Sequence, residues 1–350
     1  MNRLLLVSEA RAVGGAEVYL ERLAAGLDDW RTVLAVPASG AMAAWRKRLE
    51  TAGLQCVAYD SGASGMRQLR DLARNADLVH VNLPSTYDGG SGTLPWRLSR
   101  SGRPVVVTEH LTLLPRSRRR RLWKRLTDRA VAVRICVSRA SADGLRAEGF
   151  TRVQVIPNGV PDPGAPLPLP DGEKLRVGVA GSLETRKGID TLIEAVARVG
   201  DSRLRLEIAG DGPLRETLPA LVRARGVEEQ VSFAGQVDDI YGFFAAQDVA
   251  ALSSRLEAMP LCVLEAMAAG RGSLVTALPG MNEIVTVNST GRLLPVDDPG
   301  AWADCLAELI RDRTLVRSWG AEARRDYEAR FTLAHSVRET EKLYREVIGE

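Results

Sequence analysis

The chain has 350 residues, of which 45% are hydrophobic and 26% charged, and its formal net charge is +3. This length supports two domains with full cores, and the composition is ordinary for a soluble protein. No apolar run approaches the length of a membrane-spanning helix, so we expect a cytoplasmic protein. The four cysteines are isolated from one another and from histidines, which favours neither disulfides nor a zinc site.

Charge is distributed unevenly between the two halves of the chain. Residues 1–163 contain 25 Lys and Arg against 15 Asp and Glu, whereas residues 164–350 contain 22 against 29. A basic first half and an acidic second half indicate different partners, with an anionic partner for the first. Charge alone leaves open whether that partner is a lipid, a sugar phosphate or a nucleic acid.

The first half alternates short apolar runs with helical patterns. A loop containing Gly14 and Gly15 follows the first apolar run and leads into a predicted helix at 16–27. Strands are predicted at 4–7, 32–36, 54–58, 78–82, 105–108, 135–137 and 153–156. This alternation predicts a parallel sheet covered by helices.

A proline-rich segment separates this half from a second one with the same organisation. Residues 157–170 hold six of the seventeen prolines, which excludes a helix or a central strand. We therefore predict a first domain at 1–160, a linker at 161–171, a second domain at 172–330 and a last helical segment at 331–350. Strands are predicted at 175–180, 204–209, 231–234, 248–252 and 273–276, and helices at 188–199, 301–310, 316–329 and 333–347. The predicted fold class is α/β, with two doubly wound Rossmann-like domains facing a central cleft.

The stretch 253–270 of the second domain carries the strongest functional signal. Its sequence predicts a strand end, a turn containing Glu257, and a helix with Pro260 at its start and Glu265 on its second turn. Free backbone N–H groups at the helix start would bind an anion such as a diphosphate; they belong to residues near Met259, Leu261 and Cys262. A carboxylate on each side suits a ligand with hydroxyls on both sides of its phosphates, namely a nucleotide-sugar.

A structural interpretation of both glutamates is also open. Glu257 could be a surface loop residue, and Glu265 could line a solvated helix face. The apolar neighbours of Glu265 argue against this, because a buried carboxylate is costly unless it is paired or accepts from a ligand.

Three weaker motifs each follow a predicted strand. Lys187 lies in a loop between a strand and a helix, where it could reach a phosphate, although an ordinary polar turn explains it equally well. Gly14 and Gly15 permit close backbone approach to a ligand, or simply form a turn. His110 lies at the carboxyl end of a predicted strand, where a functional role is plausible, although a lone histidine is more often structural.

Taken together, the motifs resemble glycosyltransferase family 4, retaining enzymes of the GT-B architecture. Two glutamates separated by seven residues, here Glu257 and Glu265, are the signature of that family. The similar text extends over almost the whole chain and includes Gly14-Gly15-Ala16-Glu17, Thr108-Glu109-His110, Ile156-Pro-Asn-Gly-Val160, Lys187-Gly188, Ala209-Gly-Asp-Gly-Pro213 and Leu264-Glu-Ala-Met-Ala268.

The resemblance implies a role for each matching position in the transfer of a sugar from a UDP- or GDP-sugar to an acceptor hydroxyl. Glu265 would accept from the ribose hydroxyls, Glu257 would contact the transferred sugar, and Lys187 would hold the diphosphate. Backbone groups near Leu261 and Cys262 and the Gly14-Gly15 loop would assist Lys187. His110 would lie beside the sugar, and the backbone around Val237 would help to hold the base.

Two positions depart from the family pattern. Ser182 stands where relatives commonly have Arg, so one diphosphate contact is missing or is supplied elsewhere, for example by Arg186. Ala258 replaces the usual Gly after the first glutamate, which would narrow the sugar pocket. Neither change removes a residue that the reaction requires.

Several alternatives concern partners and activity. The resemblance implies no metal and no cofactor, since the nucleotide-sugar is a substrate, and it implies no nucleic acid. The acceptor could be a glycan, a lipid-linked intermediate or a small molecule, in polysaccharide or glycolipid synthesis. A nucleotide-sugar epimerase of the same architecture and a catalytically silent partner subunit are the competing functions.

The densest positive run of the chain, 115–129, adds a possible membrane contact. Its basic residues spread around a predicted helix that has a narrow apolar strip. One interpretation is a solvated helix whose strip packs on the first domain. The other is peripheral attachment to an anionic membrane, or contact with an anionic acceptor, through Arg118, Arg119, Arg120, Arg121, Trp123, Lys124 and Arg125.

Overall fold

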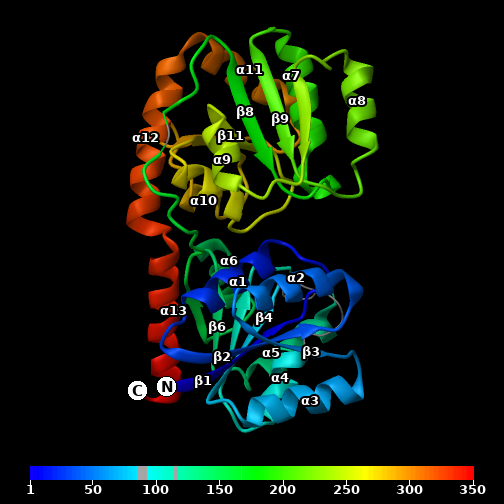
Figure 1. Ribbon diagram of the computed structural model, residues 1–350, viewed down its shortest axis with the longest axis vertical. Helices are drawn as coiled ribbons and strands as arrows, with labels where there is room; N and C mark the ends of the chain where they lie inside the picture. The colour runs from blue at the N-terminus through cyan, green and yellow to red at the C-terminus, as the bar shows by residue number, and fades with distance from the viewer. Residues whose placement is uncertain (86–92, 114–116, 167) are drawn as a thin grey trace. The chain divides into compact units, whose positions relative to one another are not determined.

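The computed structural model describes residues 1–85, 93–113, 117–166 and 168–350, and the chain divides into two compact units (Figure 1). Unit 1 comprises Met1–Gly159 together with Leu333–Glu350, and unit 2 comprises Val160–Thr332. Residues 115 and 116 of the basic run and the side chains of Arg118 and Arg120 lie outside the description. Each unit is built on one parallel sheet, as the alternating sequence pattern predicts.

Unit 1 contains a seven-stranded parallel sheet in the order β3-β2-β1-β4-β5-β6-β7. The predicted strands of this half are confirmed to within two residues at either end. Their bounds are β1 Asn2–Ser8, β2 Trp30–Pro37, β3 Gln55–Tyr59, β4 Leu78–Leu83, β5 Val105–Glu109, β6 Val133–Cys136 and β7 Val153–Val155.

Helices cover both faces of this sheet because successive strand residues point to opposite sides. Leu4 and Leu6 of β1 belong to one apolar core, whereas Leu5 and Val7 belong to another. The first core is completed by α1 Gly15–Gly26, α2 Gly40–Thr51 and α13 Leu333–Ile348, and the second by α3 Ala63–Arg74 and α4 Leu94–Ser99. The remaining helices of the unit are α5 Arg118–Asp128 and α6 Arg139–Ala147.

The last helix, α13, is part of unit 1 through apolar and polar contacts. Tyr344 is fully buried in the first core, where its hydroxyl contacts His80 Nδ1 of β4. The other ring nitrogen of His80 lies 2.8 Å from the hydroxyl of Thr108. Burial lowers the pKa of His80 to about 3, so this imidazole is neutral and bridges the sheet to the helix.

Unit 2 contains a six-stranded parallel sheet in the order β10-β9-β8-β11-β12-β13. Its strands are β8 Leu175–Ala180, β9 Leu204–Ala209, β10 Val231–Gly235, β11 Val249–Leu252, β12 Gly272–Thr276 and β13 Gly291–Leu294. The edge strand β13 was not predicted, because its four residues show no alternation and two of them are only half-buried. The five predicted strands are confirmed.

The helices of unit 2 also form two layers. They are α7 Ile189–Val199, α8 Thr217–Arg225, α9 Ile240–Ala245, α10 Leu261–Ala268, α11 Pro299–Arg311 and α12 Arg313–Arg330. Figure 1 shows α7, α8 and α11 beside β8 and β9. These helices share one core with Val177 and Val179 of β8, whereas Ala180 of the same strand packs in a second core with α9 and α10.

The strand order places each candidate site at a reversal of the sheet. In unit 1 the order reverses between β1 and β4, and in unit 2 between β8 and β11. Loops that leave the carboxyl ends of two such strands diverge to opposite faces of the sheet, and open α/β sheets bind ligands there. The Gly14-Gly15 loop follows β1, the Lys187 loop follows β8, and the Glu257 turn follows β11.

Candidate functional site

In unit 2 the structure brings Lys187 and Glu257 together, although 70 positions separate them. Lys187 Nζ donates to Glu257 Oε1 at 2.6 Å, and Ser254 Oγ donates to the same oxygen at 3.0 Å. Arg186 Nη1 also reaches this oxygen, at 3.4 Å. One carboxylate therefore orients two cations beside the carboxyl ends of the two strands at the reversal.

The backbone of the Lys187 loop is held by the segment that follows β11. Ser253 Oγ donates to the carbonyl oxygens of Lys187, at 3.1 Å, and Gly188, at 2.8 Å. Gly188 has φ +62°, and a Cβ atom there would lie 2.1 Å from the Ser253 carbonyl oxygen. Only glycine allows this approach, so Gly188 is needed for the loop to pack on β11.

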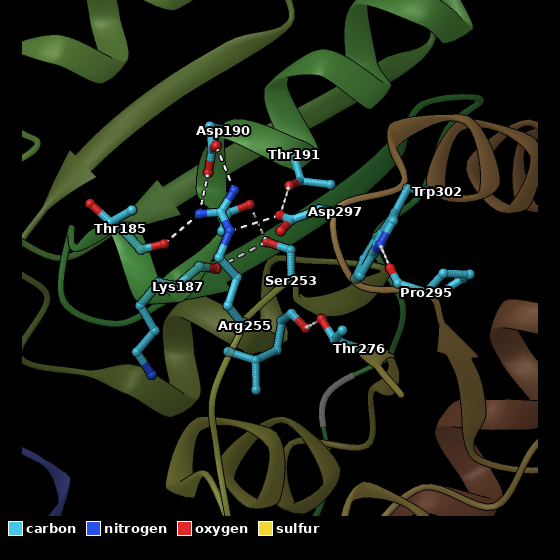
Figure 2. A network of polar contacts seen from close by, with 12 residues as sticks. Thr185, Lys187, Asp190, Thr191, Ser253, Arg255, Thr276, Pro295, Asp297 and Trp302 are labelled. Atoms are coloured by element: carbon cyan, nitrogen blue, oxygen red, sulfur yellow. Dashed lines mark hydrogen bonds and ion pairs between the residues drawn. The ribbon is translucent and has the colours of Figure 1, made fainter. Parts of the chain in front are cut away.

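Arg255 ties the same loop to helix α7 and to a third segment (Figure 2). Its guanidinium donates to both Asp190 carboxylate oxygens, at 3.0 and 2.7 Å, and to Asp297 Oδ1 at 2.7 Å. The guanidinium also donates to the Thr185 carbonyl, and the Arg255 backbone N–H donates to the Arg186 carbonyl at 2.7 Å. Figure 2 shows the Lys187 side chain extending away from this network. Arg255 therefore positions the backbone of the loop rather than its reactive end.

The Arg255 network was not predicted from the sequence. Arg255 lies two residues before Glu257, but its partners Asp190 and Asp297 are distant in the chain. The only local signal was a charged residue inside the glutamate motif, next to Ser254. Its function depends on which strands are neighbours, and sequence periodicity does not specify that.

Glu265 lies on the buried face of α10, as its apolar neighbours indicate. Glu265 is 6% exposed, and Pro260 occupies the N-cap position, one residue before α10 begins at Leu261. Cys262, on the same helix, lies within the electrostatic reach of Lys187 and Glu257, and burial raises the pKa of its thiol to about 12. The thiol is therefore neutral at physiological pH, so the first turn of α10 adds no negative charge beside Lys187.

The remaining predicted donor residues of unit 2 lie in the Lys187 loop, at the start of α10 and beside the second core. Arg186 Nε donates to Glu184 Oε2 at 2.9 Å, so the Arg186 guanidinium lies between the carboxylates of Glu184 and Glu257. Ser182 is half-buried at the start of the same loop. Val237 packs against the core formed by Ala180 and α10, which also contacts Cys262. Met259 is buried, and Leu261 is half-buried as the first residue of α10.

In unit 1 the Gly14-Gly15 loop is closed by Glu17, a residue to which sequence reasoning gave no separate role. The Gly14 N–H donates to Glu17 Oε2 at 3.1 Å, and Ser8 Oγ donates to Oε1 at 3.4 Å. Glu17 is buried, and burial raises the pKa of its carboxyl to about 7. A capping-box arrangement thus fixes the start of α1 at the carboxyl end of β1.

His110 lies close to the start of the same helix. His110 Nε2 lies 2.9 Å from Asn82 Oδ1, and Asn82 Nδ2 donates to the Ala16 carbonyl at 3.0 Å. Because the Asn82 amide nitrogen donates to Ala16, its oxygen is the acceptor, and His110 carries a proton on Nε2. Burial lowers the pKa of His110 to about 3, so the ring is neutral and its Nδ1 is an acceptor.

The surroundings of Lys124 on α5 show that one residue of the predicted membrane contact was assigned wrongly. Lys124 is 3% exposed and lies 3.8 Å from Glu109, itself fully buried beside Arg134. Burial lowers the pKa of Lys124 to about 8. Lys124 therefore faces the protein interior and is not a surface contact for a membrane.

The other residues of this helix have different surroundings. Arg121 and Arg125 contact Glu148, with nitrogen–oxygen distances of 3.1 and 3.4 Å. Trp123 is exposed, and so are Leu122 and Leu126. The alternative in which the apolar strip packs on the first domain is therefore wrong.

The sequence matches two family models, one in each unit. The model described as Glycosyltransferase Family 4 matches residues 13–162, and the model described as Glycosyl transferases group 1 matches residues 168–326. Together with the two doubly wound sheets, these matches define a chain of the glycosyltransferase families with the GT-B fold. The chain belongs to glycosyltransferase family 4, which confirms the resemblance noted in its sequence.

The chain is similar to two characterised relatives over about half of its length. The N-acetyl-alpha-D-glucosaminyl L-malate synthase of Bacillus anthracis is 29% identical over 52% of this chain and 48% of its own. The GDP-mannose-dependent alpha-(1-6)-phosphatidylinositol monomannoside mannosyltransferase of Mycobacterium tuberculosis is 33% identical over 49% of this chain and 50% of its own. The chain thus spans about half the length of these relatives.

A solved structure with the same fold covers nearly the whole chain. HepE of Anabaena, crystallised with UDP, has a TM-score of 0.85, covers 98% of this chain and 100% of its own, and is 21% identical. This similarity shows the fold. Within the described residues, the helices are all too short or too polar to span a bilayer.

Proposed function

We propose that the protein transfers a sugar from a nucleoside diphosphate sugar to an acceptor hydroxyl, with retention of configuration at the anomeric carbon. The observation that carries this proposal is the Lys187–Glu257 pair beside the start of α10. A cation held by a carboxylate next to free helical N–H groups is suited to binding a diphosphate. The buried carboxylate of Glu265, on the same helix, would accept from the ribose hydroxyls.

The charge that develops during the reaction explains the arrangement around Lys187. As the bond from the anomeric carbon to the diphosphate oxygen breaks, negative charge grows on the leaving group. Lys187 would stabilise that charge, with Arg186 supplying the second cation that Ser182 does not. Glu257 would orient both cations and contact the transferred sugar.

Retention is proposed to follow from attack on the same face of the sugar. The acceptor oxygen forms the new bond to the anomeric carbon, and its proton passes to an oxygen of the departing diphosphate. This route requires neither a metal nor a cofactor, because Lys187 and the N–H groups of α10 offset the leaving-group charge. His110, with its Nδ1 as an acceptor, and the Gly14-Gly15 loop are proposed to contact the sugar and the diphosphate.

The donor base and the acceptor are proposed as classes. UDP and GDP both remain candidates: HepE was solved with UDP-glucose, and the mycobacterial relative is named as GDP-mannose-dependent. A glycan, a lipid-linked intermediate or a small molecule would bind unit 1. This unit contains residues 1–159, which belong to the half of the chain with an excess of Lys and Arg. Polysaccharide or glycolipid synthesis in the cytoplasm is consistent with these classes.

The test is to incubate the protein with UDP- and GDP-sugars, with and without candidate acceptors, and to measure the nucleoside diphosphate released. We expect release that depends on an acceptor and a product with the anomeric configuration of the donor, determined by NMR. Conversion of the donor sugar without release would instead identify an epimerase. A donor that neither reacts nor raises the melting temperature would indicate a silent subunit.

A further inference from the structure

Helix α5 is amphipathic in the reverse sense to a core-facing helix. Lys124 and Thr127 are buried on its inner side, whereas Leu122, Trp123 and Leu126 are 58%, 53% and 47% exposed. Residues at these spacings lie on adjoining positions of one helical face. The helix therefore presents its apolar side chains outward and keeps polar groups against the protein.

The neighbouring helix α4 extends this apolar face. The Trp96 ring of α4 meets the Trp123 ring edge-on, with 6.2 Å between their centroids. The Arg100 guanidinium lies over Trp96, 5.0 Å from its ring centroid. Two tryptophans, two leucines and a stacked arginine thus adjoin on the surface of unit 1.

Among the described residues, exposed arginines adjoin this face at both ends of α5. Arg119 is exposed in the first turn of α5, before the apolar residues, and Arg129 is exposed at the C-cap position, after them. The only acidic residue of α5, Asp128, contacts Arg134 of β6 and is not directed to the outer face. The α5 surface, defined by Trp96, Leu122, Trp123, Leu126, Arg119 and Arg129, is therefore apolar with a cationic border.

We propose that the α5 surface binds an anionic lipid bilayer, with its leucines and tryptophans inserted at the headgroup level and its arginines contacting lipid phosphates. Tryptophan and leucine on one face and arginine beside them are characteristic of helices that lie in a membrane interface. A symmetric contact between two copies would bring the same arginines together and is disfavoured by their repulsion. This proposal is independent of the transfer reaction and requires no donor.

Flotation with lipid vesicles tests the proposal directly. We expect the full chain to float with vesicles of phosphatidylcholine mixed with phosphatidylglycerol, and not with phosphatidylcholine alone. Binding should weaken as salt shortens the screening length from about 10 Å at 0.1 M to about 3 Å at 1 M. Quenching of tryptophan fluorescence by lipids brominated in their acyl chains should fall in Trp123→Phe and be largely lost when Trp96→Phe is added.

Matched variants separate the apolar and the charged contributions. Leu122→Gln with Leu126→Gln should lower the partition coefficient by at least about tenfold. The control is Val287→Gln, at an exposed apolar residue of unit 2. Arg119→Gln with Arg129→Gln should lower it by about 30-fold at low salt, and the control Arg311→Gln with Arg317→Gln removes the same charge from unit 2.

Three results would overturn the proposal. The first is equal binding to vesicles with and without the anionic lipid. The second is vesicle binding by the Leu122 and Leu126 double variant that equals that of the parent, with both folded by circular dichroism. The third is a parent chain that does not bind vesicles but dimerises in solution, with the double variant monomeric, which would assign the α5 surface to a second copy.

Discussion

The Lys187 loop of unit 2 and helix α5 of unit 1 both carry several cations, but their surroundings differ. In the loop, Lys187 and Arg186 both contact the carboxylate of Glu257, and Ser253 and Arg255 from the segment after β11 hold the loop backbone. On α5, one cation is buried while apolar side chains face outward. Cations held in place by carboxylates suit charge stabilisation in a reaction, whereas an exposed apolar face with a cationic border suits adsorption to a surface.

Removing the central cation should have the largest effect. Lys187→Ala should lower kcat by about 100- to 1000-fold and weaken donor binding far less, because its interaction strengthens as the leaving group gains charge. Steady-state kinetics and calorimetric titration of the donor would measure the two effects. Lys174→Ala, at an exposed lysine of the same unit, is the control. An unchanged kcat would exclude Lys187 as the group that stabilises the leaving diphosphate.

The second prediction concerns the buried carboxylate of α10. Glu265→Ala should weaken donor binding by about 10- to 150-fold, since hydrogen bonds to a charged acceptor contribute roughly 1.5–3 kcal/mol. Glu265→Gln keeps the side-chain volume and should recover part of the loss, which distinguishes a hydrogen-bonding role from a cavity. If both variants bound the nucleotide as tightly as the parent, the ribose role would be wrong.

The third prediction tests whether the Arg255 network positions Lys187. Arg255→Gln should lower kcat by about tenfold, because a displaced cation interacts less with the developing charge. It should cause little further loss in a Lys187→Ala background, since the two substitutions act through one group. Arg225→Gln breaks a comparable surface pair with Glu194, also on α7, and serves as the control. Fully additive losses would mean that Arg255 acts independently of Lys187.

The last prediction concerns Lys124, the inward cation of α5, and it affects stability rather than activity. Its pKa is lowered from 10.5 to about 8, so the unfolded chain binds more protons than the folded one between these values. The stability of the parent relative to Lys124→Met should therefore rise with pH from about 8 to 10.5, by on the order of 1–3 kcal/mol.

Urea unfolding at several pH values would measure this rise. The exposed Lys47→Met in the same unit is the matched control. A stability difference that stayed constant with pH would place the Lys124 ammonium in solvent. The α5 helix would then have no buried cation, and only its outward apolar side chains would distinguish it from the Lys187 loop.

The sequence by itself predicted the two Rossmann-like halves and most of their strands. Apolar periodicity indicates which residues of a strand or helix are buried, and the proline-rich segment indicates where regular structure ends. The sequence also located the Lys187 loop, the Glu257 turn and Glu265 after predicted strands. Edge strand β13 was not predicted from the sequence, because its four residues do not alternate between apolar and polar and so give no periodic signal.

Only the tertiary structure decided which of these segments meet. Strands β8 and β11 are neighbours in the sheet although β9 and β10 lie between them in the chain, and this adjacency brings Lys187 to Glu257 and Arg255 to Asp190. It also decided that α5 turns Lys124 inward and Trp123 outward. A helical pattern shows which residues share a face of the helix. Which face packs against the protein depends on the residues of the neighbouring elements. For α5, that neighbour is Glu109 of a buried strand, which lies beside Lys124.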